Sequence, residues 1–270
     1  MIGIAISPFR NNKTGSNGGV AYDADAQLFF DRVTAAGGSL SLTEKGATNQ
    51  LVLDLKTSGA WSKRKIIYPY VGSSAAACAQ NLASSSFTGS FSSGFLFAST
   101  GIIGTTAYMS TGFNPSVEGL AYNDNSIGIY TRYDNQNTGQ YDCGCGNNNG
   151  SALFDICVRR SGNTAIYDCA NWPDNRVSAS NSDSSGFFLG KANSSTAKFY
   201  RNGASLGTKA LTARSMPNYE LYAYSFNEQG TVTYYTNQES SLFWCGLGLT
   251  DAEAVSLSTA VATFEAALGR

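Results

Sequence analysis

The chain has 270 residues, of which 42% are hydrophobic, so it is long enough for one large domain or two small ones with a sizeable core. Only 14% of the residues are charged and 29 are glycine, a composition typical of β-rich extracellular or virion proteins rather than of cytosolic helical enzymes. The net charge of −1 offers no basis for binding nucleic acid or an anionic membrane. Histidine is absent from the sequence, which excludes Ser-His-Asp and Cys-His catalysis and histidine-based metal or haem sites.

Residues 1–22 are rich in Asn and Gly and lack the periodicity of a core element. We interpret them as an extended arm, and an ordered arm of this composition is expected to lie against a partner subunit. No apolar run reaches the roughly 18 residues that cross a bilayer, so no membrane contact is expected. Residues 1–6 are too short for the apolar region of a secretory signal, and no basic residue precedes them. Release by another route, such as assembly into a particle followed by host lysis, is therefore expected.

A helix is predicted over residues 24–36, where Asp23 can serve as the N-cap and Gly37 as the stop. Its apolar side is predicted to contain Leu28, Phe29 and Val33. Residues 23–60 are expected to form a helical pair, because a second helical pattern follows at once. A pair this short cannot bury its apolar stripes alone, so it must pack on the rest of the chain.

The second helix opens on Ser41 and Glu44, which have the spacing of a capping box, and it ends at Gly59. Its predicted core positions are Ala47, Leu51, Val52 and Leu55. A third helix, over residues 250–269, opens on Thr250 and Glu253 in the same way. Its predicted core positions are Ala254, Leu257, Val261, Phe264 and Leu268. We favour docking of this helix on the sheets over a role as an oligomer seam, because three full heptads are lacking.

From Trp61 onward the hydrophobic pattern changes to a period of two, as in β-strands. Segments of strand length, rich in β-branched and aromatic residues, cover residues 66–71, 90–98, 105–110, 126–133, 152–159, 164–169, 186–189, 197–201, 219–226, 231–235 and 241–247. Many short strands without helices between them favour an antiparallel arrangement over a parallel sheet. We therefore predict a mainly β protein, a two-sheet antiparallel β-sandwich over residues 61–270, with an N-terminal helical pair and a C-terminal helix.

The clearest local signal is Asn202-Gly203, which lies between two short apolar runs and predicts a type I′ hairpin. Centring the turn there places Tyr200 opposite Ser205 and Phe199 opposite Leu206. The last pair is then assigned to the core face, and the Tyr200 pair to the opposite face.

Six cysteines are present, and the sequence alone cannot choose among their 15 pairings. Cys157 and Cys169 flank a predicted turn, so they are candidates for cross-strand neighbours. Cys143 and Cys145 are two residues apart, a spacing that a disulfide tolerates poorly within one strand. The cysteines lack the C-x₂-C knuckle of common zinc sites, so we favour buried thiols or disulfides over a metal site, and no cofactor is expected.

The segment at residues 186–207, GFFLG followed by KFYRNGASLG, resembles the hairpin of laminin G-like, concanavalin A-like jelly rolls. Residues 23–72 and 246–270 resemble the flanks of such domains in bacteriophage virion proteins. The resemblance extends over residues 22–270 and implies a jelly roll in a tail, tail-fibre or head-decoration protein. It also implies a location on the surface of the phage particle, other virion proteins as partners of residues 1–22, and homo-oligomers. It says little about ligands, because this fold serves lectins, glucanases and purely structural modules.

No E-x-D-x-x-E strand, the pattern of a jelly-roll glucanase, occurs among the acidic residues, so we predict no catalytic residues and no enzyme activity. Two polar turns, residues 123–125 and 134–139, are interpreted as Asx turns rather than as calcium sites. Glycan binding requires exposed aromatic rings beside polar groups. The segments 130–141 and 171–176, in loop-like context, supply the candidate glycan-binding residues Tyr133, Tyr141, Trp172, Asp174 and Arg176. The alternative is that Trp172 seals an end of the sandwich and that the tyrosines line a sheet face.

The sequence thus favours a non-enzymatic virion structural protein that can recognise a host surface glycan. The alternative is a free, lectin-like carbohydrate-binding module, and a polysaccharide-degrading enzyme ranks third.

Overall fold

A computed structural model describes residues 21–135 and 141–270 of the chain. Within these residues the chain forms two β-sheets, one of eight strands and one of nine, and helices pack on the outer face of the eight-stranded sheet. This arrangement confirms the predicted two-sheet sandwich with an N-terminal helical pair and a C-terminal helix. Residues 1–20, most of the predicted arm, lie outside the described residues.

The first helix, α1 (Ala24–Ala35), begins where the sequence predicts. The carboxylate of its N-cap, Asp23, accepts a hydrogen bond from the backbone amide of Asp25. The prediction that Leu28 faces the core is wrong, because its side chain is 56% exposed. The buried stripe of α1 instead consists of Ala26, Phe29, Phe30 and Val33.

The helices α2 (Leu42–Ser58) and α4 (Asp251–Ala267) both begin with the predicted capping box. In each, the N-cap hydroxyl accepts a hydrogen bond from the third amide of the helix, and the third side chain, a glutamate, accepts one from the N-cap amide. Two shorter helices, η1 (Ala60–Lys63) and α3 (Ala75–Cys78), complete the helical elements of the described chain. None of the helices in residues 21–135 and 141–270 has both the length and the apolarity to cross a membrane.

The eight-stranded sheet has its longest strands at its centre, where β6 pairs with β11 on one side and with β17 on the other. The far edge of β17 is shared by β1 and β4, so this one strand has three neighbours. The strands run in the order β13 (Ala204–Ala210), β12 (Thr196–Arg201), β11 (Gly186–Asn193), β6 (Asp124–Thr131), β17 (Glu239–Gly246), β4 (Gly101–Gly104), β3 (Phe95–Ala98), with β1 (Arg64–Tyr68) beside β17.

The nine-stranded sheet is antiparallel except where β15 joins β7 in parallel. Its strands run in the order β10 (Arg176–Ser180), β9 (Thr164–Ala170), β8 (Leu153–Arg160), β7 (Cys143–Gly146), β14 (Tyr222–Ala223), β5 (Met109–Ser110), β2 (Ser90–Phe91). Two further short strands, β15 (Phe226–Glu228) and β16 (Thr231–Thr233), form a hairpin beside β7.

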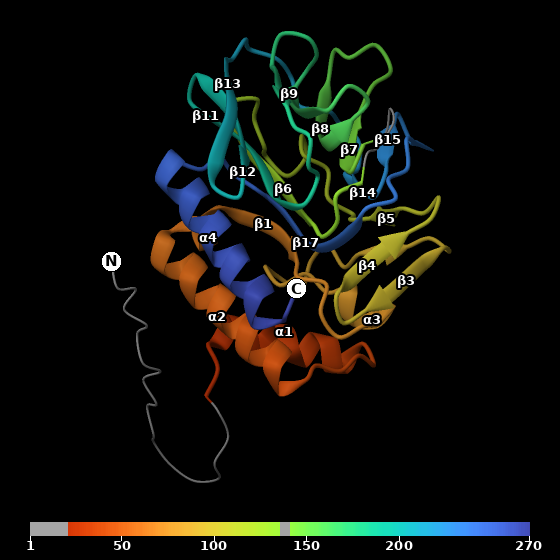
Figure 1. Cartoon of the computed structure of the whole chain (residues 1–270), viewed down its shortest axis with the longest axis vertical. Coiled ribbons are helices and arrows are strands. Elements are labelled where there is room, and N and C mark those ends of the chain that lie inside the picture. Colours follow the sequence, from red (N-terminus) through yellow and green to blue (C-terminus); the bar gives the residue numbers. More distant parts are fainter. Residues whose placement is uncertain (1–20, 136–140) are drawn as a thin grey trace.

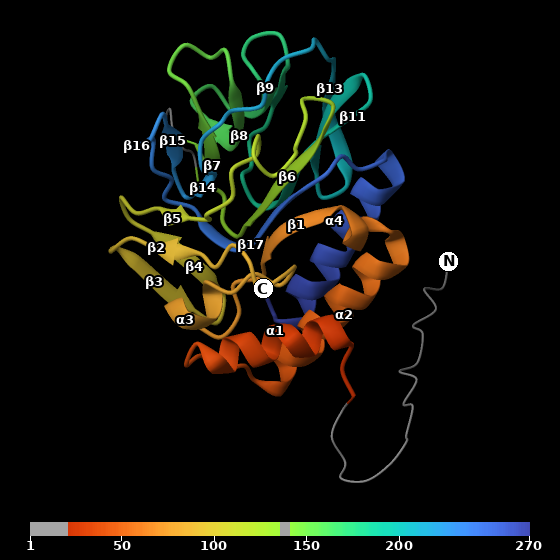
Figure 2. The same ribbon diagram turned by 180° about the vertical axis from the view of Figure 1, so that it is seen from behind.

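Two apolar cores alternate with the sheets. The first lies between the sheets and contains Ile127, Phe188, Phe199, Phe154 and Tyr167. The second lies between the eight-stranded sheet and the helices and contains Phe187, Leu189, Tyr200, Trp244 and Phe264. Successive residues of β11 therefore enter opposite cores, as the pleat of a strand requires. In Figures 1 and 2, α1, α2 and α4 gather on one side of the molecule, and β7, β8, β9 and β15 lie on the other.

The predicted hairpin forms at Asn202-Gly203, with φ values of 50° and 80° at the two turn residues. Tyr200 lies opposite Ser205, as predicted. A β-bulge then shifts the register, so Phe199 lies opposite Gly207 instead of Leu206. The side chains of Phe199 and Leu206 nevertheless reach the same inter-sheet core.

Three strands were not predicted: β4, β7 and β10. The sequence of β7, Cys-Gly-Cys-Gly, has no β-branched or aromatic residue, and β4 has a glycine at each end. The predicted strands at residues 90–98 and 219–226 each divide into two short strands. Of these strands, β2, β7, β10, β14 and β15 belong to the nine-stranded sheet, and β3 and β4 form one edge of the eight-stranded sheet.

All six cysteines are free and buried. The proposed neighbours Cys157 and Cys169 are not cross-strand partners, because Cys157 lies opposite Ile166 and Cys169 lies opposite Phe154. Burial raises the pKa of each thiol, to about 12 for Cys78 and about 11 for Cys169. These thiols belong to the packed interior.

Candidate functional site

A pocket of about 260 Å³ opens on the outer face of the nine-stranded sheet. Its described lining comes from two parts of the sheet. One part is the residue two before β7, the turn between β7 and β8, and the start of β8. The other is the loop between β9 and β10, the start of β10, and the β15–β16 hairpin with the segment that follows it. The lining residues are Tyr141, Asn147, Asn148, Asn149, Gly150, Leu153, Trp172, Arg176, Phe226, Glu228 and Tyr234. The pocket therefore combines aromatic rings with amide and charged groups.

Three of its aromatic rings pack against one another at one side. The centroid of the Tyr141 ring lies 4.8 Å from that of Phe226 and 5.5 Å from that of Tyr234. Phe226 is buried beneath, whereas Tyr234 is 46% exposed. The backbone amide of Tyr141 donates a hydrogen bond to the Tyr234 carbonyl at 3.3 Å, which ties the two segments together. The exposed ring of Tyr234 is therefore supported by the rings of Tyr141 and Phe226.

Trp172 supplies a second exposed ring, 49% accessible to solvent. Its backbone amide donates to the Gly150 carbonyl at 2.9 Å, so the loop before β10 is fastened to the β7–β8 turn. Gly150 has a φ of +75°, and a Cβ there would lie 3.1 Å from the indole ring. The Arg176 guanidinium lies 5.5 Å from the centroid of the same ring, a cation–π contact. The ring of Trp172 is thus held from two sides and still faces solvent.

A row of three ionisable residues crosses neighbouring strands beneath the pocket. Asp155 of β8 lies opposite Asp168 of β9, which lies opposite Arg176 of β10. The Arg176 guanidinium donates to both carboxylate oxygens of Asp168, at 2.7 Å and 2.5 Å. Burial alone would lower the pKa of Arg176, but the hydrogen bonds and the charge of Asp168 outweigh it and raise this pKa.

Asp155 is buried, and within the described chain neither of its carboxylate oxygens has a hydrogen-bond donor. Burial, together with the charge of Asp168, raises the pKa of Asp155 well above its ordinary range, so this carboxyl group keeps its proton to a higher pH than a free aspartate does. Burial of the Tyr141 side chain, and then the nearby negative charge of the aspartate pair, raise the pKa of Tyr141. Its phenol therefore remains a hydrogen-bond donor.

Gly144 of β7 leaves the space that the Asp155 side chain occupies. It lies opposite Asp155, and a Cβ at position 144 would come within 2.4 Å of the Asp155 Cβ and 2.9 Å of the Phe226 ring. Only a glycine allows the carboxyl and the ring to meet above this strand.

Two polar side chains of the pocket make no side-chain hydrogen bond or ion pair with any part of the chain that the structure describes: Asn148 and Glu228. The adjacent Asn147 is different, because its amide bonds Ser151 at 2.7 Å and the Ala152 backbone at 3.1 Å. Asn147 therefore shapes the turn, whereas Asn148 and Glu228 offer donor and acceptor groups to a ligand.

Three of the five residues predicted to bind glycan line this pocket: Tyr141, Trp172 and Arg176. Asp174 is not among the lining residues, and it pairs instead with Arg214 at 2.5 Å. Tyr133 is 55% exposed, lies outside the lining, and packs near Arg132. Arg176 was assigned to a loop, but it begins strand β10.

Sequence reasoning missed the other half of the pocket. Tyr234 and Glu228 were placed in or beside predicted strands, and nothing in the sequence brings them to Trp172. The run Asn147–Asn149 is the available signal, because consecutive amide side chains in a turn between strands can fix the turn and leave one amide, here that of Asn148, for a ligand.

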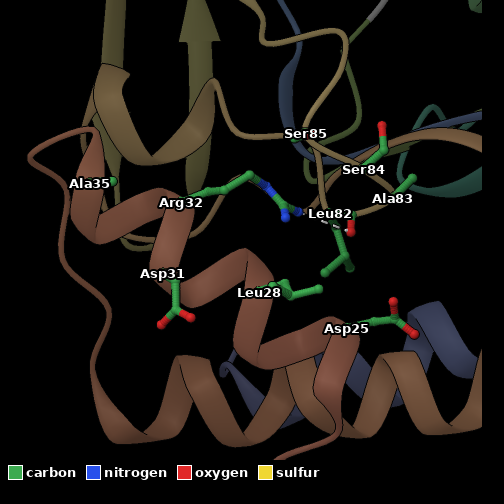
Figure 3. Close-up of a pocket in the computed structure, with 9 residues that line it drawn as sticks. All are labelled: Asp25, Leu28, Asp31, Arg32, Ala35, Leu82, Ala83, Ser84 and Ser85. Carbon is green, nitrogen blue, oxygen red and sulfur yellow. Dashed lines mark hydrogen bonds between the residues drawn. The ribbon is translucent and has the colours of Figure 1, made fainter.

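A larger cavity, of about 560 Å³, lies between α1 and residues 82–85 (Figure 3). Leu28 and Leu82 point into it from opposite walls, and the Arg32 side chain reaches across to donate to the Asn81 carbonyl at 2.8 Å. Its carboxylates are engaged, since Asp25 pairs with Lys56 at 2.5 Å and Asp31 accepts from Gln27 at 2.8 Å. This groove offers few unused polar groups, so the smaller pocket is the better candidate site.

No group of three histidine, cysteine, aspartate or glutamate side chains is placed to hold a metal ion within residues 21–135 and 141–270. In the predicted Asx turn at residues 134–139, Asp134 bonds the Ser184 amide at 2.9 Å and Arg159 at 2.5 Å. Residues 136–139 of that turn lie outside the described residues.

No protein-family model matches the chain, and no curated protein matches it in sequence. Among solved structures it is similar to domain 4 of AbnA, an extracellular GH43 arabinanase from Geobacillus stearothermophilus, solved with arabinotriose. That likeness has a TM-score of 0.53 and 10% identity, and it covers 73% of this chain and 98% of the other. It is also similar to the binding domain of Paraclostridial Mosquitocidal Protein 1, with a TM-score of 0.52 and 11% identity, over 73% of this chain and 52% of that one. At these identities the comparisons establish a shared β-sandwich fold and leave the ligand to be argued from the site.

Proposed function

We propose that this protein is a non-enzymatic carbohydrate-binding module that holds a sugar in the pocket beside Trp172 and Tyr234. The observation that carries the proposal is the pairing of two half-exposed rings with unbonded polar groups in one concave site. The C–H face of a sugar ring stacks on an aromatic face, while its hydroxyls exchange hydrogen bonds with amides and carboxylates. The arabinotriose held by AbnA domain 4, a protein of similar fold, supports this reading of the pocket.

The absence of activity remains a prediction. It is supported by the positions of the acids, because Glu228 is the only carboxylate in the described lining. Asp155 and Asp168 are both fully buried and cannot reach a substrate in this arrangement. Retaining and inverting hydrolases use two accessible carboxyl groups, one on each side of the bond they cleave.

The virion role, the arm contacts of residues 1–22 and the homo-oligomer remain predictions from the sequence resemblance. The pocket favours the free binding module, since a purely structural subunit has no need of exposed rings beside unpaired polar groups. A glycan-binding module can also be part of a particle, so copurification of the protein with phage particles would decide its location.

Binding to an array of immobilised plant, bacterial and animal glycans, followed by calorimetry with the best binder, tests the proposal. W172A and Y234A are each expected to weaken binding tenfold or more, equivalent to about 1.4 kcal/mol. Y133A is the matched control, because Tyr133 is an exposed aromatic residue outside the described pocket lining. Unchanged affinity in both pocket variants, or an equal loss in Y133A, would contradict the assignment.

A further inference from the structure

The charges of the pocket point to a class of ligand. Among the described residues of its lining, Arg176 is the only cation and Glu228 the only anion. A guanidinium that is free to rotate would recognise an acidic sugar by a bidentate pair with its carboxylate. Whether Arg176 can do this depends on what already holds it.

Arg176 is already committed to Asp168. Two of its nitrogens donate to the two oxygens of that carboxylate, and its side chain is only 16% exposed. The Asp168 side chain is fully buried, so the pair is fixed from below. The positive charge of Arg176 is therefore cancelled before any ligand arrives.

Glu228 is then the only uncompensated charge on the described lining. Asp174, two residues after Trp172 in the chain, forms its own pair with Arg214 at 2.5 Å. Arg160 of β8 is close enough to influence the pKa of Tyr141, but it does not line the pocket.

We propose that the pocket selects uncharged glycans and rejects those that carry a carboxylate or a sulfate, because Glu228 is its one uncompensated charge and Asp168 neutralises Arg176. This inference rests on the proposed function. An anionic sugar would be held against a carboxylate in a partly desolvated site, where like charges repel strongly. A neutral sugar meets only rings, amides and a hydrogen-bond acceptor.

The test compares neutral glycans with relatives that have the same core and carry acidic sugars: lactose with sialyllactose, and unsubstituted xylan with glucuronoxylan. For each pair of which the neutral member binds, the acidic member is expected to bind at least tenfold more weakly at low salt. The difference should shrink as ionic strength rises, because salt screens the repulsion.

Two variants locate the effect. E228Q is expected to reduce the discrimination between paired glycans by threefold or more and to remove most of its salt dependence. E118Q removes an acid outside the described lining and should leave both the discrimination and its salt dependence unchanged. Equal or tighter binding of the acidic members overturns the inference while the proposed function stands. Undiminished discrimination in E228Q also overturns the inference. If the protein binds neither neutral nor acidic glycans, both the inference and the proposed function are overturned.

Discussion

The two sheets of the sandwich have outer faces of opposite character. The outer face of the eight-stranded sheet is sealed by helices, which bury Phe187, Leu189 and Trp244 in a second apolar core. The outer face of the nine-stranded sheet has no helix among the described residues, and it carries a row of charges and a pocket instead. One face of the fold is thus packed for stability, and the other carries the proposed binding site.

The two faces can be compared through the buried carboxyl group that each contains. Each face contains a fully buried carboxyl group whose pKa is raised by burial: Glu265 under the helices and Asp155 under the pocket. The cations near them differ, because Arg176 is locked onto Asp168 whereas Arg270 lies 4.0 Å from Glu265.

The largest effect is expected from the pair of opposed aspartates. D168N leaves the Arg176 guanidinium without its carboxylate, so the free energy of unfolding should fall by about 3–5 kcal/mol. D155N should come closest to the wild type below about pH 4, where the unfolded state begins to keep this proton as the folded state does. As pH rises, only the unfolded wild type loses this proton, so D155N should become progressively more stable than the wild type.

Urea unfolding from pH 4 to pH 8 measures both variants. A large loss in D155N with little loss in D168N would reverse the assignment of charge between the two aspartates. A loss of glycan binding in D168N at a temperature where it remains folded would support the role of the pair in holding Arg176.

The sealed face is tested by Glu265. Burial, opposed by the charge of Arg270, raises its pKa from 4.5 to about 7. An acid whose pKa is raised on folding does not lower the free energy of unfolding at pH values below its unfolded pKa. It lowers that free energy as the pH rises from the unfolded pKa toward the folded pKa. The wild type should therefore lose about 3 kcal/mol relative to E265Q between pH 4.5 and pH 7. Parallel stability curves for the two proteins over this range would contradict the prediction, and E118Q, at an acid outside both the helices and the described pocket lining, serves as the control.

The smallest effect is expected at Asp174, one of the two predicted site residues that lie outside the described lining. Its pair with Arg214 is exposed, with 40% of each side chain accessible. D174N should therefore change the free energy of unfolding by less than about 1 kcal/mol. It should also leave glycan affinity within about twofold, and a tenfold loss of affinity would return Asp174 to the site.

The sequence predicts the sealed face better than the binding face. Helix ends are local signals, so Ser41 with Glu44 and Thr250 with Glu253 could be identified from spacing alone. The binding face depends on β7 and β10, whose residues have no strong strand preference and are extended by their neighbours. Glu228 and Tyr234 meet Trp172 only through pairings between distant segments, and no local pattern encodes such pairings.

The position of β17 in the sheet determines when the eight-stranded sheet can form during synthesis. Residues 239–246 lie between β6 on one side and β1 and β4 on the other, and they are translated after all three (Figure 1). Until they emerge from the ribosome, β1 has no partner and the edge of β6 is open. The eight-stranded sheet must therefore close late, after most of the chain has been synthesised. Before it closes, the nascent chain exposes unpaired strand edges, and a chaperone would matter most at this stage.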